Sequence, residues 1–122
     1  NLSLWSTISR GLGVKVYYFL QPLLGWGKDP SKEEQEITEF IDNNTRKFSS
    51  HKIMNKLKGL DQYYSYQKLL KTYCDKLNII FFDCNQMLKE NSTKTDWLFV
   101  DRAHMNDDGY NLLSNYIGRK IE

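Results

Sequence analysis

The chain has 122 residues, of which 40% are hydrophobic and 14% aromatic, and its 17 basic and 15 acidic residues give a net charge of +2. This length fits one domain or part of one, and the apolar content excludes an intrinsically disordered chain. The basic residues are spread along the sequence, so no nucleic-acid-binding stripe is predicted, and the apolar runs are far shorter than the roughly 20 residues that cross a bilayer.

The first predicted elements are a helix and a buried strand. Residues 2–12 indicate the last turns of a helix, because Gly13 after them is typical of a C-cap. The run VKVYYFL at 14–20 is rich in β-branched and aromatic side chains and stops before Pro22, which lacks the N–H that a sheet ladder needs. It predicts a strand, followed by a loop at 23–29.

A second helix is predicted from two signals at its start. Asp29 before Pro30 suits the N-cap and first helical positions, and Ser31 with Glu34 suits a capping box. Both signals lead to the same helix, and the basic residues at 46–47 suit its carboxyl end. The side chains expected on its buried face are Ile37, Phe40, Ile41 and Phe48.

The second half of the chain again alternates helix and strand. The expected elements are a polar connection at 49–59 with one helical turn at 53–57, a helix at 60–77, a strand at 79–83, a short helix at 86–90 and a terminal helix at 107–120. In the helix at 60–77, helical spacing predicts a buried face made of Tyr66, Leu69, Leu70, Tyr73, Cys74 and Leu77. In the terminal helix the inward residues are expected to be Tyr110, Leu113, Tyr116 or Ile117, and Ile121. Asn78 suits the left-handed conformation after a helix.

Both predicted strands lack apolar–polar alternation, which is typical of strands covered on both faces in a parallel sheet. The order of elements therefore predicts an α/β fold. Two parallel strands rarely make a stable sheet alone, so we expect further strands from an upstream segment or from another chain. The start at Asn1 rather than Met fits a missing upstream segment, with residues 1–122 as the C-terminal portion of a single domain.

Cysteine usage and the amino terminus say little about the compartment. Cys74 and Cys84 show neither a CxxC motif nor a histidine at metal-ligand spacing, so neither a disulfide scaffold nor a zinc site is predicted. No signal peptide is visible at the start of the chain. The compartment stays undetermined, with a reducing, cytoplasmic setting slightly favoured.

The candidate catalytic residues are Asp101 and His104 in the segment FVDRAHMNDDGY. A spacing of three in a turn can place a carboxylate against one imidazole nitrogen while the other nitrogen faces outward. Such a pair can take a proton from a serine hydroxyl and return it to a leaving group. The alternative is an exposed loop histidine beside an aspartate that caps a helix.

Several other residues are weighed against structural roles. Gln21, at the carboxyl end of a predicted parallel strand, is a candidate for substrate contact, although such a glutamine is more often structural. Trp26 is a candidate wall of an acyl or sugar pocket, with core packing as the alternative, and Trp97 is weighed in the same way. Asp83 is expected to cap the next helix, and His51 is expected at the surface.

The segment after His104 carries two further acidic residues. His104, Asp107 and Asp108 together suggest a divalent metal site, but two acids at a helix N-terminus are already explained by the helix dipole. Asn106 is the expected N-cap. We therefore predict no metal and no cofactor.

The segment WLFVDRAHMNDDGYNLLSNYI resembles the last conserved block of the SGNH, or GDSL, hydrolase family. Upstream, VKVYYFLQP and LNIIFFD are similar to two strands of that family, so the resemblance covers nearly the whole chain. It implies a three-layer α/β/α sandwich, with Asp101 and His104 as the aspartate and histidine of a catalytic triad. The family's nucleophilic serine and its oxyanion-hole glycine and asparagine are not in this chain, and none of its serines has a G-D-S or G-x-S-x-G setting.

The resemblance implies a serine ester hydrolase that acts on a carboxylic ester, such as an acetyl group on a carbohydrate. An O-acyltransferase is a close variant, and a catalytically silent interaction or sugar-binding module is the alternative from another class. The expected partners are a small ester or acylated carbohydrate and the missing N-terminal segment of the same protein, with no nucleic acid and no membrane span.

Overall fold

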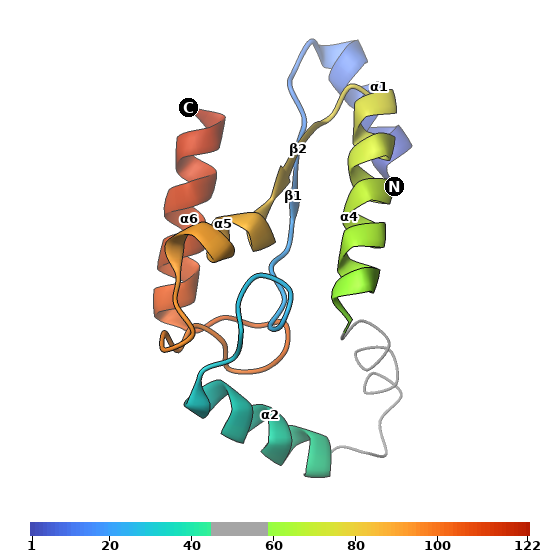
Figure 1. Ribbon diagram of the computed structural model, residues 1–122. Coiled ribbons are helices and arrows are strands. Elements are labelled where there is room, and N and C mark those ends of the chain that lie inside the picture. Colours follow the sequence, from blue (N-terminus) through green and yellow to red (C-terminus); the bar gives the residue numbers. More distant parts are fainter. Residues whose placement is uncertain (45–58) are drawn as a thin grey trace.

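The computed structural model describes residues 1–44 and 59–122. Within these ranges the chain forms five helices and one two-stranded parallel sheet (Figure 1). The elements are α1 (Leu2–Leu12), β1 (Tyr17–Leu20), α2 (Lys32–Asn44), α4 (Leu60–Lys76), β2 (Ile80–Asp83), α5 (Cys84–Asn91) and α6 (Asp107–Ile121). The predicted α/β class is confirmed at this level. The predicted basic pair at 46–47, Phe48, His51 and the helical turn at 53–57 lie outside the described residues.

The two strands pair in parallel, with Tyr17 opposite Ile80 and Leu20 opposite Asp83. Side chains alternate between the two faces of the sheet. Tyr18 and Phe81 pack on the side of α4, whereas Phe19 packs on the other side, against the same core as Leu112 and Leu113 of α6. Figure 1 shows α4 and α6 on opposite sides of the strands.

Two small cores lie on the two faces of the sheet. One contains Leu20, Trp26 and Tyr63, with Leu70 of α4 packed against it. The other contains the following buried side chains: Cys84, Met87, Leu88, Leu98, Phe99 and Met105. The second core lies against α6 and includes both residues that flank the predicted catalytic loop, Phe99 and Met105.

Four predicted signals at element ends are confirmed, whereas α2 begins at Lys32 and so does not take Asp29 and Pro30 as its N-cap and first position. Gly13 has φ 64° after α1 and Asn78 has φ 57° after α4, so both adopt the expected left-handed conformation. Asp83 caps α5 by accepting a hydrogen bond from the Asn85 N–H, and Asn106 caps α6 by accepting one from the Gly109 N–H. Short-range hydrogen bonding therefore sets the ends of these elements as expected.

The first strand is shorter than predicted. Its predicted residues 14–16 are not part of β1, because Val14 is engaged with the end of α1. The Val14 N–H donates to Ser9 O at 3.2 Å, and Ser9 Oγ donates to Val14 O at 2.5 Å. The strands are also only partly buried, with Ile80 38% exposed.

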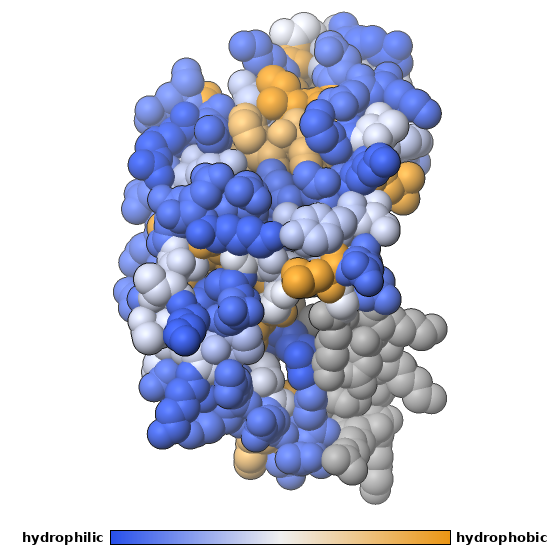
Figure 2. All heavy atoms as spheres, viewed as in Figure 1, coloured by the Kyte–Doolittle hydropathy of each residue, from blue (hydrophilic) through white to orange (hydrophobic). Residues whose placement is uncertain are grey.

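The predicted buried helix faces are partly wrong. Residues that were expected inside but are largely exposed are Phe40 in α2, Tyr66, Leu69 and Tyr73 in α4, and Tyr110 and Ile121 in α6. In α4 the prediction is confirmed for Cys74, which is fully buried, while Tyr63, which was not on the predicted face, is buried because it packs in the core beside the sheet. Figure 2 shows hydrophobic atoms at the surface over the two strands, between α6 and α4.

The carboxylate of Glu34 joins three segments of the chain. The predicted capping box is present, since the Ser31 N–H donates to Glu34 Oε2 at 2.7 Å and the Glu34 N–H donates to Ser31 Oγ at 3.3 Å. Lys28 Nζ also donates to Oε2. Oε1 accepts the N–H groups of Leu98 and Phe99 at 2.8 and 2.9 Å. Glu34 is only 1% exposed. Burial of a carboxylate is tolerated here because each of its two oxygens accepts two hydrogen bonds.

No helix in residues 1–44 and 59–122 is long and apolar enough to cross a membrane.

We expect Glu34→Gln to lower the free energy of unfolding by about 3–5 kcal/mol, because it leaves the buried Lys28 ammonium without a counter-charge. Glu36→Gln is the matched control. Glu36 is exposed and lies 3.8 Å from Lys32, so that change should stay within about 0.5 kcal/mol. Urea unfolding of both variants measures the difference, and equal effects would contradict the role given to Glu34.

We expect Gly109→Ala to destabilise the fold by about 1–3 kcal/mol through overpacking. An added Cβ would lie 2.5 Å from Leu98 O and 2.9 Å from Met105 Cβ. Gly118→Ala in the same helix meets nothing within 4 Å and should raise stability by roughly 0.5–1 kcal/mol. Thermal unfolding should therefore shift in opposite directions for the two variants.

Candidate functional site

The loop that carries Asp101 and His104 is anchored at both ends by buried residues. Phe99 and Met105 form an antiparallel bridge, and the Val100 N–H donates to His104 O at 3.0 Å. Phe99 and Met105 are both buried in the core against α6. The loop between them is therefore held at both ends while its own side chains reach the surface.

Asp101 and His104 form the pair that their spacing predicts. Asp101 Oδ2 lies 2.7 Å from His104 Nδ1. Asp101 Oδ1 accepts the backbone N–H groups of Ala103 and His104, each at 2.7 Å. One carboxylate thus holds both the backbone of the turn and the imidazole ring.

The free nitrogen of His104 faces outward. The side chain of His104 is 69% exposed, and Nε2 has no partner among the residues that the structure describes. A carboxylate that accepts from Nδ1–H favours the tautomer with a lone pair on Nε2. The geometry therefore presents a base to a group that approaches from outside the loop.

Hydrogen bonding keeps Asp101 ionised. Partial burial would raise the pKa of Asp101, but the N–H groups of Ala103 and His104 and the His104 ring outweigh it and lower the pKa below its ordinary value. The aspartate is therefore charged at neutral pH, as the role of orienting an imidazolium requires.

The end of β1 and the residues after it hold the same loop from the side. Gln21 Nε2 donates to Ala103 O at 2.8 Å, and the Leu24 N–H donates to Arg102 O at 3.0 Å. Arg102 also pairs with Asp42 of α2 at 2.5 Å. The substrate contact expected of Gln21 stays a prediction. Sequence reasoning missed Arg102 and Asp42, because nothing in the local pattern pairs residues so far apart.

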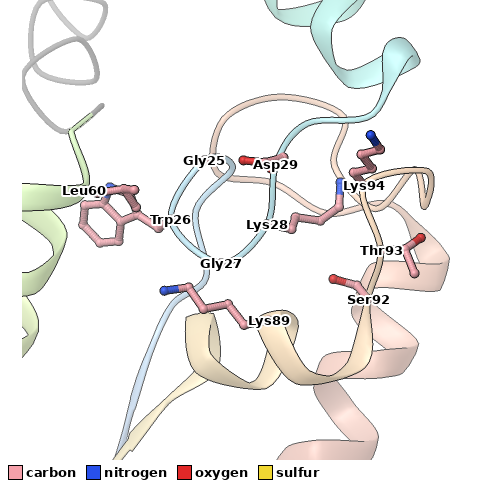
Figure 3. A pocket seen from close by; sticks show the side chains of 10 residues that line it. All are labelled: Gly25, Trp26, Gly27, Lys28, Asp29, Leu60, Lys89, Ser92, Thr93 and Lys94. Atoms are coloured by element: carbon pink, nitrogen blue, oxygen red, sulfur yellow. The ribbon is translucent and has the colours of Figure 1, made fainter.

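Trp26 is buried in the core, where it packs against Tyr63. It is 3% exposed, and its ring centroid lies 5.3 Å from that of Tyr63. Trp26 also lines a cleft of about 310 Å³, whose other walls include Lys28, Lys89, Lys94, Ser92 and Thr93. That this cleft takes an acyl or sugar group stays a prediction. In Figure 3 the Trp26 ring points toward Leu60 and away from Lys28 and Lys94. Neither Asp101 nor His104 lines this cleft.

The acidic residues near the pair do not assemble a metal site. Asp83 is occupied as the cap of α5 and also accepts a hydrogen bond from Tyr63 Oη at 2.7 Å. Asp107 and Asp108 occupy the first turn of α6. In the described part of the chain no three His, Cys, Asp or Glu side chains lie close enough together to hold a metal ion.

Comparison with protein-family models and with curated proteins finds no match to this chain. The resemblance to the SGNH hydrolases therefore stays a prediction that depends on the residues of the loop and its flanking elements. The geometry itself establishes an aspartate–histidine pair on an anchored loop, with one imidazole nitrogen open.

We expect Asp101→Asn to be less stable than the wild type near neutral pH, with the difference shrinking as the pH falls below about 4. The reason is that native contacts lower the pKa of Asp101, so its ionised form stabilises the fold above the ordinary carboxyl range and this contribution is lost in acid. Urea unfolding between pH 3 and pH 7 measures the effect. A difference that grows toward acid pH would contradict it.

Proposed function

We propose that this chain is the C-terminal part of an SGNH-type serine ester hydrolase and supplies the aspartate and histidine of its triad. The observation that carries the proposal is the 2.7 Å contact between Asp101 Oδ2 and His104 Nδ1, with Nε2 open to the outside. The nucleophilic serine and the oxyanion hole would come from sequence outside the 122 residues. The substrate class is a carboxylic ester, such as an O-acetyl group on a carbohydrate.

In this mechanism His104 moves one proton twice. Nε2 takes the proton of the serine hydroxyl as its oxygen attacks the ester carbonyl, and the imidazolium then returns that proton to the leaving alcohol. Water adds to the acyl-enzyme in the second half, with His104 again accepting and then returning a proton. Asp101 stays ionised and stabilises the imidazolium, which its lowered pKa supports.

The exposed apolar surface supports the larger fold that the proposal needs. A three-layer α/β/α sandwich would cover both faces of a sheet with more than two strands. Ile80 of β2 is 38% exposed, Val14 before β1 is 49% exposed and Leu69 of α4 is 65% exposed. These side chains suit burial against additional strands and helices, which we place in an upstream segment of the same protein.

An O-acyltransferase would use the same pair with a hydroxyl acceptor instead of water. A catalytically silent module would keep the loop as structure only. Product analysis distinguishes an O-acyltransferase from a hydrolase. Loss of activity on changing His104 distinguishes both enzymes from a catalytically silent module.

We expect His104→Ala in the full-length protein to lower kcat for a p-nitrophenyl acetate-type ester on the order of 10⁴-fold. His51→Ala, which changes the only other histidine in the chain, is the matched control and should retain activity. A chelator should have no effect on the wild type, whereas chelator-sensitive hydrolysis would favour metal chemistry. Hydrolysis that is indifferent to His104 would exclude the triad role.

A further inference from the structure

The peptide bond between Ala103 and His104 is held at both of its polar ends. Its N–H, which belongs to His104, donates to Asp101 Oδ1 at 2.7 Å. Its carbonyl oxygen, which belongs to Ala103, accepts from Gln21 Nε2 at 2.8 Å. Because a peptide unit is planar and turns as one body, two partners on opposite ends fix its orientation.

The orientation of this peptide determines where the His104 ring points. The Asp101 contact is local and moves with the loop, since both partners lie within it. The Gln21 contact is different, because Gln21 directly follows β1 and is fixed by the sheet rather than by the loop. The Gln21 hydrogen bond therefore fixes the orientation of the Ala103–His104 peptide relative to the sheet. Open α/β sheets bind their ligands at the carboxyl ends of the parallel strands, which is where Gln21 lies.

We propose that Gln21 is a positioning residue for His104, holding the Ala103–His104 peptide so that Nε2 faces the reacting group. This inference rests on the proposed function and deepens it. It assigns Gln21 to the loop rather than to the substrate. The side chain of Gln21 is exposed, so the hydrogen bond is expected to contribute more to geometry than to overall stability.

Two replacements remove the donor without changing the length of the side chain much. Gln21→Met removes both polar atoms, and Gln21→Glu places a charged acceptor against the Ala103 carbonyl. Gln35→Met is the matched control, because Gln35 Nε2 also donates to a backbone carbonyl, that of Pro30 at 3.4 Å, on an exposed surface. Thermal unfolding of all three variants identifies any that are not folded.

The first readout is the ring of His104 in the ¹H–¹⁵N spectrum of the full-length protein near neutral pH. The wild type should show the Nδ1–H tautomer, and Gln21→Met and Gln21→Glu should weaken or broaden that signal while Gln35→Met leaves it unchanged. This readout needs no activity, so it decides the positioning role even if the protein proves not to hydrolyse esters. An unchanged His104 signal in both Gln21 variants would overturn the proposal.

The second readout is the split between kcat and KM for ester hydrolysis. A misplaced base lowers kcat with KM nearly unchanged, and a displacement of about 1 Å can cost roughly 10²-fold. We expect a fall of about 10-fold to 10²-fold in kcat for both Gln21 variants. A raised KM with unchanged kcat would instead show that Gln21 contacts the substrate and would overturn the positioning role.

Discussion

A single buried carboxylate holds together the parts of the molecule on which the candidate site depends. Glu34 accepts from Ser31, from Lys28 and from the backbone of Leu98 and Phe99, so all of its strong acceptor positions are used. Desolvation of an ionised group is tolerated only with such pairing. The consequence is that the start of α2, the loop after β1 and the segment entering the Asp101–His104 loop keep a fixed relation to one another.

The sequence predicted the parts of this arrangement that are encoded within a few residues. The capping box of Ser31 and Glu34, the caps at Asp83 and Asn106, and the spacing of Asp101 and His104 all place a side-chain acceptor near a backbone donor or a ring two or three residues away. The two contacts from Glu34 to residues 98 and 99 could not be predicted, because their donors are backbone N–H groups that every residue but proline carries.

Helix faces were predicted less well than helix positions. In α4, apolar side chains occur on two overlapping faces, one through Tyr66, Leu69 and Tyr73 and the other through Tyr63 and Cys74. Periodicity shows that such a helix has an apolar face but does not say which side meets the sheet. The contacts of Tyr63 with Trp26 and with Asp83 determine which side of α4 is buried, and both depend on segments distant in the sequence.

The pairing of β1 with β2 also has a consequence for how the site comes into being. Tyr17 and Ile80 are partners although about 60 residues separate them, so their contact forms only after a large loop has closed, at an entropic cost that local helices do not carry. Gln21 follows the first of these strands and meets the loop at 101–104. The orientation of His104 thus depends on long-range contacts of the chain, and amide hydrogens near β1 are expected to exchange together with those of the loop when the sheet opens.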